Sequence, residues 1–387
     1  MANRELVHDE PNGRRMRGDP VPVMRSRKNS DPPGHIAIVL LTGLGDVVHG
    51  LPLVNALRDH YPSTRITWIV ERMPGQLLSG HPSIDRIVVY RRSEGLTGIR
   101  QLRRDLNAGD PIDLTLNLNV YFKSVWPTLL SRAPRRIGFD RSRAFDGVWL
   151  ASNERIPTRP RAHTADMTLE FADYLGVPVP TPEWRLAFSD AERHEQSGFF
   201  SRFDGRPVAT IIPASATIKK DWMAERWATV ADALESDFGM NVIIAGGPGE
   251  REQAAGREIV AKSSAKIEWT MGDSVRRLAW IVDKSNLLLA PDTGPIHVAR
   301  ALNVPVVGLF AHTNPWRVGP WRAFEDLWVD HYTDEGTAPN ATDRKPKWDR
   351  MPTITVDEVL QRVQVAADKY SVARRRSVVP SSRAELR

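Results

Sequence analysis

Residues 35–51 have the sequence HIAIVLLTGLGDVVHGL, which passes from a continuous apolar run through a glycine-rich turn into helical spacing. An apolar run without polar alternation predicts a strand that is covered on both faces, as in a parallel sheet. After the turn, apolar residues recur at the spacing of one helix face, at Val47, Val48, Leu51, Val54 and Leu57. The stretch therefore predicts a strand, a turn and a helix, the repeating unit of a parallel sheet wrapped by helices.

Two series of such units follow along the chain. In the first, further strands are predicted at residues 65–70, 87–90 and 113–118. The second begins after the proline-rich segment 177–182, with strands at 208–212, 241–245, 287–289 and 304–310 and a helix from about Ala224 to Ser236. The fold class is thus α/β, in two halves joined between residues 180 and 205. Two such halves placed face to face would form a ligand cleft at the carboxyl ends of both sheets.

The composition indicates a globular protein that works without cysteine chemistry. The 387 residues are 41% hydrophobic, which is enough for two cores of ordinary domain size. The absence of cysteine excludes disulfides, thiolate metal sites and thiol nucleophiles, and suits a reducing compartment. No apolar run is long enough to span a membrane, and the arginines near the N-terminus precede no apolar signal core. We therefore expect a cytoplasmic protein.

The formal net charge of +6 is unevenly distributed. The last 19 residues carry a net +5 and the first 34 a net +2, so the region between them is nearly neutral. Within that region, residues 86–161 hold fifteen Lys and Arg against seven Asp and Glu, a net +8. Such a basic stretch indicates either an acidic partner, such as phosphate groups, or a solvated arginine-rich surface.

Asp46 is a candidate general base in the first half. It follows Gly43 and Gly45 at the predicted corner between strand and helix, where the third glycine of a dinucleotide-binding fingerprint is missing. A carboxylate at the mouth of the cleft could accept a proton from a substrate hydroxyl. The alternative is that Asp46 caps the helix. His49 lies near the same helix face and is a candidate for a supporting role.

The segment PDTGPIH, residues 291–297, joins a predicted buried strand to a helix in the second half. Its backbone amides, the Thr293 hydroxyl and the positive end of the helix dipole could bind an anion such as a diphosphate. The alternative is an ordinary strand–helix connection capped by Asp292 or Thr293. After the preceding strands, Ser215 and Lys220 could hold phosphate. Glu250, which follows a glycine-rich corner, could accept ribose hydroxyls or simply begin a helix.

Several chemistries are excluded by missing patterns. The sequence has no zinc-ligand spacing, no aspartate pair arranged for a metal, no Walker A segment and no Gly-x-Ser-x-Gly elbow. We therefore expect neither a metal nor another cofactor.

Taken together, three motifs resemble glycosyltransferase family 9, the ADP-heptose:lipopolysaccharide heptosyltransferases. They are Gly-Asp-Val-x-His at residues 45–49, Lys-x-Trp at 220–222 and Asp-[Ser/Thr]-Gly-x-x-His at 292–297. They occur in the family's order, and the resemblance covers about residues 35–310. Residues 68–71 and 122–124 resemble the branch that adds the first heptose to the inner core.

The resemblance implies a GT-B fold, in which two Rossmann-like domains face each other across a cleft and a C-terminal helix crosses back to the first domain. We expect a disordered tail at residues 1–33, an acceptor-binding domain at 34–190, a nucleotide-sugar-binding domain at 191–352, the crossing helix at 353–370 and a basic disordered tail at 371–387. Family members transfer sugars with inversion and without a metal. The expected partners are ADP-heptose and a phosphorylated Kdo-lipid A acceptor, reached by a monomer in peripheral contact with the inner membrane leaflet.

The resemblance also implies a role for each matching residue. Asp46 would be the catalytic base, and Asp292 would contact the donor sugar. The leaving diphosphate would be held by Ser215, Lys220 and the Thr293–Gly294 backbone, with Lys219 as an alternative to Lys220. Glu250, or Glu252 in another register, would bind the ADP ribose. Pro295 and His297 would complete the donor site, and the acceptor would be met by Lys123, Arg91 and Arg143.

Three other functions remain open on the sequence alone. A family 9 enzyme could use another nucleotide sugar or build another surface glycan, and a related chain could bind a nucleotide without catalysis. The basic segments could also bind nucleic acid, but they lack stacking aromatics and a groove-reading helix, so we expect no nucleic-acid partner.

Overall fold

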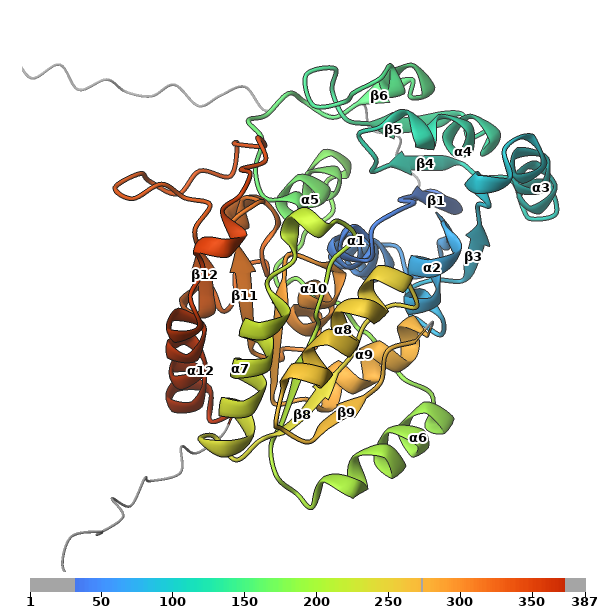
Figure 1. The fold of residues 1–387 in the computed structure, drawn as a ribbon. Helices are drawn as coiled ribbons and strands as arrows, with labels where there is room; N and C mark the ends of the chain where they lie inside the picture. Colours follow the sequence, from blue (N-terminus) through green and yellow to red (C-terminus); the bar gives the residue numbers. More distant parts are fainter. Residues whose placement is uncertain (1–31, 273, 373–387) are drawn as a thin grey trace, which may run out of the picture. The chain divides into compact units, whose positions relative to one another are not determined.

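The computed structural model describes residues 32–272 and 274–372, which form two six-stranded parallel sheets (Figure 1). The first sheet has the order β3-β2-β1-β4-β5-β6, with β1 (His35–Val39), β2 (Arg65–Val70), β3 (Arg86–Val89), β4 (Leu114–Asn117), β5 (Arg135–Gly138) and β6 (Glu154–Arg155). The second has the order β12-β11-β10-β7-β8-β9, with β7 (Val208–Ile211), β8 (Asn241–Ile244), β9 (Ile267–Trp269), β10 (Leu287–Pro291), β11 (Val306–Phe310) and β12 (Trp328–Asp330). The predicted α/β fold is confirmed.

The two sheets share one topology. Counted from its own first strand, each has the order 3-2-1-4-5-6 of the doubly wound nucleotide-binding fold. The order reverses between β1 and β4 in the first sheet and between β7 and β10 in the second. Ligands of such folds bind beyond the carboxyl ends of the strands at this reversal. The turns that follow β1, β4, β7 and β10 are therefore where a site is expected.

The chain passes from one half of the structure to the other between α5 (Thr164–Leu175) and α6 (Asp190–Phe200). The first of these helices packs against α1 (Leu44–His60), which follows β1, and the second against α9 (Val275–Lys284), which precedes β10. We call residues 32–188 the N-terminal half and residues 189–372 the C-terminal half. The domain limits expected from the sequence stay a prediction. The expected tails lie outside the described residues except for the innermost two residues of each.

Helix α1 lies at the centre of the described structure. It contacts α5 of the N-terminal half and α10 (Gly294–Ala301) of the C-terminal half, and Figure 1 shows α1 and α10 side by side. Residues on all its sides are buried between Leu44 and Leu57, which explains why this helix is so rich in apolar and small residues. Beneath it, β1 is buried along its whole length, and the buried Trp68 indole donates a hydrogen bond to the Leu40 carbonyl at 3.1 Å.

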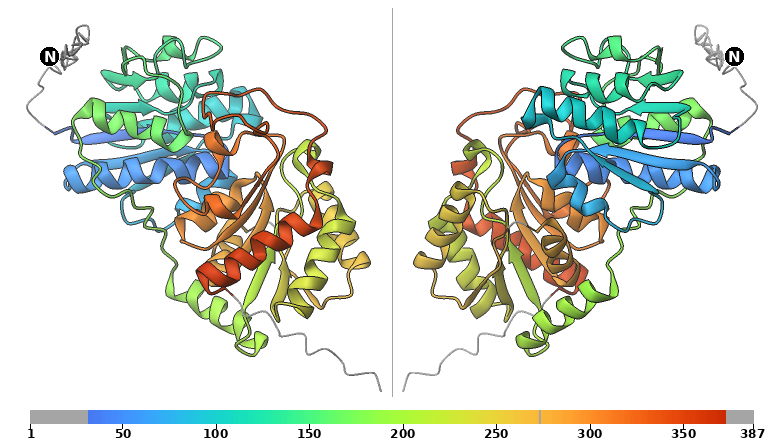
Figure 2. Two further views of the ribbon diagram at one scale, coloured as in Figure 1. Left: turned by 90° about the vertical axis from the view of Figure 1, so that its left-hand side faces the viewer. Right: turned by 90° about the vertical axis from the view of Figure 1, so that its right-hand side faces the viewer.

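The C-terminal helix does not cross back to the N-terminal half, so this part of the expectation is wrong. Helix α12 (Val356–Tyr370) packs against α7 (Ala224–Ser236), β11 and β12 of the second sheet (Figure 2). Its apolar side, which includes Val359 and Val363, is fully buried there. The Trp222 indole also donates a hydrogen bond to the Ile354 carbonyl at 3.1 Å, which ties the start of this helix to the C-terminal half.

Besides these helices, the described residues form five further α-helices. They are α2 (Arg72–Gly75), α3 (Leu96–Asn107), α4 (Val125–Leu130), α8 (Glu250–Lys262) and α11 (Pro315–Val318). Among all helices of the described ranges, none combines the length and the apolarity that crossing a bilayer requires.

Candidate active site

A cavity of about 460 Å³ opens where the strand ends of both halves meet. It is lined by the turn before α1, by the segments that follow β7 and β8, and by the turn between β10 and α10. The residues predicted from the sequence that line it are Asp46, His49, Lys220, Asp292, Thr293, Gly294, Pro295 and His297. The structure therefore brings three motifs together that are up to 250 residues apart in the chain. We call this space the donor cavity.

The first turns of α1 and α10 touch each other beside the donor cavity. A Cβ atom added at Gly45 would overlap the His297 ring, and one at Gly294 would lie 2.7 Å from the Cβ of Leu44. Both glycines are thus required for the close approach of the two helices. The packing role of Gly294 was not evident from its motif, which had suggested an anion site alone.

Replacing Gly45 with alanine should destabilise the fold and impair the site together, because the added methyl must displace the His297 ring. Overpacking of this kind costs about 1–3 kcal/mol, and we expect a lower melting temperature. Gly198→Ala is the matched control, since a Cβ at this helical position would meet no atom within 4 Å. A wild-type melting temperature for Gly45→Ala would contradict the close packing.

Three buried histidines join the helices behind the cavity. His49 Nε2 and His297 Nδ1 are 3.1 Å apart, and the rings of His49 and His163 lie 5.2 Å apart between centres. His163 also caps α5, because its Nδ1 accepts a hydrogen bond from the amide of Ala165, while its Nε2 contacts the Gly319 carbonyl. These contacts link elements of both halves, and they place His297 in a packed cluster as well as in the cavity wall.

Acidification is expected to destabilise the protein through this cluster. Burial lowers the pKa of His163 and of His297 to about 4, and that of His49 also falls, whereas all three would titrate near 6.5 when unfolded. The unfolded chain then binds more protons between these values, so stability falls as the pH drops below about 6.5. Asp46 acts in the opposite sense over the same range, because its pKa is raised in the folded protein.

Denaturant titrations at pH 7.5 and pH 5 would measure this loss, which we expect to be about 2 kcal/mol for each of His163 and His297. The His163→Asn variant keeps a side chain suited to cap α5, and its stability should depend less on pH. Equal unfolding free energies of the wild type at both pH values would contradict the buried neutral state.

Asp46 lies in the wall of the donor cavity, where solvent still reaches its side chain. Desolvation by the surrounding protein raises the pKa of its carboxyl to about 6, while Lys123 and Arg317 oppose the rise and Asp292 adds to it. A carboxylate of raised pKa is a stronger base and is still largely ionised at neutral pH. The geometry therefore suits Asp46 to proton abstraction. Its place on α1 does not make it a cap, because Gly43 occupies that position.

Lys220 and Asp292 form an ion pair across the donor cavity. Lys220 Nζ lies 2.7 Å from Asp292 Oδ2, and the same oxygen accepts a hydrogen bond from the Thr313 hydroxyl at 2.5 Å. Burial would raise the pKa of Asp292, but Lys220 and Thr313 outweigh it and hold the pKa below its usual value. The neighbouring Lys219 turns away, with its Nζ 3.7 Å from the centre of the Trp348 ring. The lysine that faces the cavity is therefore Lys220.

The start of α10 provides amides that no side chain caps. Thr293 occupies the N-cap position without a side-chain hydrogen bond to the helix, and Pro295 lacks an N–H group. The free amides and the helix dipole leave this end of the cavity suited to an anion. This placement agrees with the anion site expected from the motif. Neither the Asp292 nor the Thr293 side chain makes a hydrogen bond that caps the helix.

Two predicted donor residues are turned away from the cavity. The Ser215 hydroxyl donates to the Thr217 carbonyl at 2.8 Å within its own loop, and the cavity is lined by its neighbours Ala214 and Ala216 instead. Glu250, the first residue of α8, is exposed and pairs with Arg257 at 2.9 Å. Neither Ser215 nor Glu250 lines the cavity in the structure described here, so their positions do not support the expected donor contacts.

Glu252 takes the place expected of Glu250. It lies in the first turn of α8, and its Oε2 accepts a hydrogen bond from the Gly247 amide at 2.8 Å. Because Glu252 lies two positions after Glu250 on the helix, its side chain faces back toward the glycine-rich corner and lines the cavity. Among the described residues, none donates a hydrogen bond to the other oxygen, Oε1, so it can accept one from a ligand.

A second cavity of about 210 Å³ lies on the other side of Asp46. It is lined by the segment after β4, by residues near the end of β5 and by the segment before α5. Asp46, Thr164 and Arg317 line both cavities, so the two spaces adjoin at the candidate base. We call this space the cationic cavity, because its lining contains Lys123, Arg143, Arg161, Arg317 and Arg344 and no acidic residue other than Asp46.

The three predicted acceptor residues lie in different surroundings. Lys123 lines the cationic cavity, donates to the Thr42 hydroxyl and has a pKa that burial lowers against the opposing effect of Asp46. Arg91 is exposed, lies 3.7 Å from Glu94 and lines neither cavity. The expectation for Arg91 is therefore not supported by its position.

Arg143 is a structural residue rather than a free cation. Its guanidinium is buried and bonds to the carboxylates of Asp140 and Glu170 and to the Pro157 carbonyl. Two carboxylates more than neutralise its charge, and every nitrogen of the group is engaged. The expected contact of Arg143 with an acceptor phosphate is corrected accordingly: the residue fixes the wall of the cationic cavity.

Three arginines of the cationic cavity belong to no motif and were not predicted: Arg161, Arg317 and Arg344. Arg317 follows the Asn314–Pro315 pair beyond β11, so its position after a predicted strand was the only signal for it. Arg161 and Arg344 lie in long irregular segments whose course the sequence pattern does not predict. Within residues 32–272 and 274–372, no three His, Asp or Glu side chains are grouped to hold a metal ion.

Residues 99–340 match the family model of glycosyltransferase family 9 (heptosyltransferase), over more than half of the chain. The chain belongs to glycosyltransferase family 9. This family 9 protein is accordingly an enzyme, a glycosyltransferase. It is 33% identical over 305 residues to the lipopolysaccharide core heptosyltransferase OpsX of Haemophilus influenzae, across 77% of this chain and 85% of that protein. It is 24% identical to lipopolysaccharide heptosyltransferase 1 of Pseudomonas aeruginosa, across 74% and 81% of the two chains.

Solved structures of family members share its fold. The family 9 glycosyltransferase of Veillonella parvula has a TM-score of 0.71 at 23% identity and covers 86% of this chain and 97% of its own. The Escherichia coli heptosyltransferase WaaC with ADP has a TM-score of 0.68 at 20% identity and covers 86% of this chain and 100% of its own. The GT-B arrangement expected from the sequence is thus confirmed, apart from the course of α12.

Proposed function

We propose that this family 9 enzyme transfers a heptosyl group from ADP-heptose to the Kdo-lipid A inner core of lipopolysaccharide, with inversion and without a metal. The observation that carries the proposal is the place of Asp46, which lines both the donor cavity and the cationic cavity. A base at this junction can reach an acceptor hydroxyl on one side and a sugar donor on the other. The identity to a lipopolysaccharide core heptosyltransferase supports the choice of donor and acceptor.

The proposed reaction is a single displacement. The acceptor oxygen forms a bond to the anomeric carbon of the donor as the bond from that carbon to the diphosphate breaks. The proton of the acceptor hydroxyl passes to Asp46, and the electron pair of the broken bond leaves with ADP. Attack from the side opposite the leaving group inverts the anomeric carbon.

The leaving diphosphate needs stabilisation as its negative charge develops. Lys220 and the uncapped amides at the start of α10 face the same cavity and provide it. Before the donor binds, Asp292 holds Lys220 in place. The free oxygen of Glu252 would accept a hydrogen bond from a ribose hydroxyl.

The proposal predicts how the rate depends on pH. Asp46 must be ionised to take the proton, so kcat/KM should fall below about pH 6. Lys123 is the cation that most lowers the pKa of Asp46. Removing it, as in Lys123→Met, should move the acidic limb of the profile to higher pH. An acidic limb at the same pH as in the wild type would contradict the role of Asp46, even if the maximal kcat/KM of the variant differed.

The same proposal places the enzyme as a monomer on the cytoplasmic face of the inner membrane. Phe122, Trp126, Leu129 and Leu150 are large apolar residues that are 40–74% exposed. They lie on η3 (Phe122–Ser124), α4 and η4 (Val148–Ala151), which contact one another beside the cationic cavity. Flotation with anionic vesicles should recover the wild type but less of a Trp126→Ser, Leu150→Ser double variant.

A donor comparison tests the proposed function. Turnover is measured with ADP-heptose and with other ADP-, UDP- and GDP-sugars, each with Kdo-lipid A and with EDTA present. We expect transfer from ADP-heptose alone, undiminished by the chelator. Transfer from another nucleotide sugar would favour the rival family 9 activity, and ADP binding with no turnover of any donor would favour a non-catalytic module.

A further inference from the structure

The cationic cavity contains more positive charge than the described structure neutralises. Lys123, Arg161, Arg317 and Arg344 line it, and none of them forms an ion pair with a carboxylate among residues 32–272 and 274–372. The fifth cation, Arg143, is already paired with two carboxylates. Like charges gathered around one cavity repel one another, and a bound anion would offset that repulsion. The cavity is therefore suited to an acidic ligand.

Arg317 is the arginine that the two cavities share. It lines both cavities, its charge acts on Asp46, and its buried Nε has no hydrogen-bond partner in the described part of the chain. Its helix, α11, is held in place by Asn314, whose Oδ1 accepts a hydrogen bond from the Trp316 amide at 3.0 Å. An arginine fixed in this way offers its free N–H groups to a ligand beside the candidate base.

Arg344 comes from the C-terminal half and reaches the N-terminal half. Its Nη2 donates to the Tyr121 hydroxyl at 2.9 Å, and its guanidinium lies 4.9 Å from the centre of the Phe145 ring. The guanidinium of Arg161 lies at the same distance from that ring. Burial lowers the pKa of Arg161, and the charge of Arg344 adds to this effect. Two arginines from different halves are thus held together on one aromatic ring.

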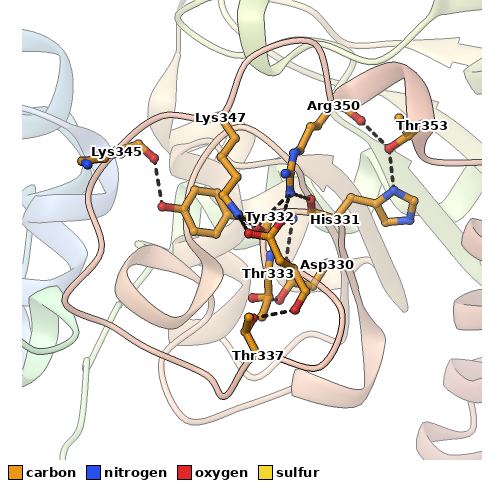
Figure 3. Close-up of polar contacts among 10 residues, drawn as sticks. Asp330, His331, Tyr332, Thr333, Thr337, Lys345, Lys347, Arg350 and Thr353 are labelled. Atoms are coloured by element: carbon orange, nitrogen blue, oxygen red, sulfur yellow. Dashed lines mark hydrogen bonds and ion pairs between the residues drawn. The ribbon is translucent and has the colours of Figure 1, made fainter.

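The segment that carries Arg344, residues 331–350, is fixed at its base by a polar network (Figure 3). The Tyr332 hydroxyl donates to the Lys345 carbonyl at 2.9 Å, and Lys347 Nζ donates to the Tyr332 carbonyl at 2.6 Å. Asn314 Nδ2 bonds to the Asp343 carbonyl at 3.0 Å, which joins this segment to α11. Connected hydrogen bonds therefore position the segments that carry Arg317 and Arg344.

We propose that Arg161, Arg317 and Arg344 form a subsite that binds an oxyanion of the acceptor, a carboxylate or a phosphate, next to the hydroxyl that Asp46 deprotonates. This inference rests on the proposed function for the identity of the acceptor, but the subsite itself is defined by the geometry. Guanidinium groups bind such anions through paired N–H donors. Because the arginines come from both halves, the bound anion would also hold the two halves together around the reacting atoms.

Steady-state kinetics test the subsite in the working enzyme. Arg161→Gln and Arg344→Gln should raise the KM for Kdo-lipid A about 10- to 100-fold, the loss typical of a charged hydrogen bond, and change the KM for ADP-heptose less than about threefold. Arg344→Lys should recover only part of the loss. Arg159→Gln is the matched control, since Arg159 is exposed, pairs with Asp173 and lines neither cavity. Equal acceptor KM values for the three glutamine variants would overturn the proposal.

Direct binding separates this inference from the proposed function. In the Lys220→Ala background, where the donor cavity has lost its lysine, the protein is titrated with inorganic phosphate and, separately, with the free sugar acid Kdo. Binding of phosphate alone indicates a phosphate group, and binding of Kdo alone indicates a carboxylate. Either must weaken at least tenfold with Arg344→Gln and persist with Arg159→Gln. This result would support the subsite even if ADP-heptose were not a donor, and binding of neither probe would overturn it.

Discussion

Replacing Asp46 with asparagine is expected to lower kcat by about 10²–10⁴-fold, the range for loss of a general base. Asparagine keeps the size of the side chain and its position between the two cavities but cannot accept the proton of the acceptor hydroxyl. The binding of ADP should change little, because the groups proposed to hold the diphosphate, Lys220 and the start of α10, are other parts of the cavity lining.

The measurement pairs single-turnover kinetics with calorimetric titration of ADP. Far-ultraviolet circular dichroism and the melting temperature verify that the variant folds. Asp59→Asn is a suitable control, since this exposed carboxylate pairs with Arg185 on the surface. An Asp46→Asn variant that turns over at the wild-type rate would show that another group takes the proton.

Replacing Lys220 with alanine is expected to lower kcat about 10²–10³-fold, comparable to the loss of one preorganised donor to a developing anion. The reason is that Lys220 lines the donor cavity beside the start of α10, with its ammonium 2.7 Å from Asp292. ADP affinity should also fall, because the proposed contact of Lys220 with the diphosphate would be present in the ground state as well.

Lys219→Ala provides a control with the same change of charge one residue away. Its side chain packs over Trp348 instead of entering the cavity, so we expect nearly wild-type kinetics. Removing Lys220 leaves Thr313 as the side-chain partner of the buried Asp292 among the described residues, and the melting temperature of this variant must be measured alongside its activity. Equal losses in both variants would contradict the assignment of the phosphate contact to Lys220.

The central strands could be predicted from the sequence because they are buried on both faces. The runs at residues 35–41 and 287–289 are continuous and apolar, and both become central strands of their sheets. The short strands β5, β6, β9 and β12 were not predicted. They contain polar residues such as Arg135 and Glu154, which form an ion pair across neighbouring strands. At the edges of a sheet, pairing partners rather than an apolar run determine the structure.

The motifs located the site, but they did not determine which side chains face it. The sequence placed Asp46, Lys220 and Asp292 in one cleft because the carboxyl ends of parallel strands converge. It could not distinguish Glu250 from Glu252, since the choice depends on the direction of the first turn of α8. It also assigned Arg143 to the acceptor, because its partner Glu170 on α5 comes next to it only in the folded chain.

The distribution of charge explains how one site could bind two substrates in cavities of different charge. In the donor cavity the Lys220 charge is balanced by Asp292, whereas in the cationic cavity the Arg161, Arg317 and Arg344 charges are unbalanced among the described residues. Asp46 lies between them, so its ionisation responds to both sides. A transferase that joins a diphosphate-activated sugar to an acidic acceptor needs this combination.

The most direct test of the central claim is the structure of the product formed from ADP-heptose and Kdo-lipid A without added metal. Mass spectrometry of the lipid and nuclear magnetic resonance of the new glycosidic linkage are measured on the same sample. The account predicts one added heptose, an anomeric configuration opposite to that of the donor, and release of one ADP per heptose transferred. An unmodified lipid beside intact ADP-heptose, or a linkage that retains the configuration of the donor, would contradict it.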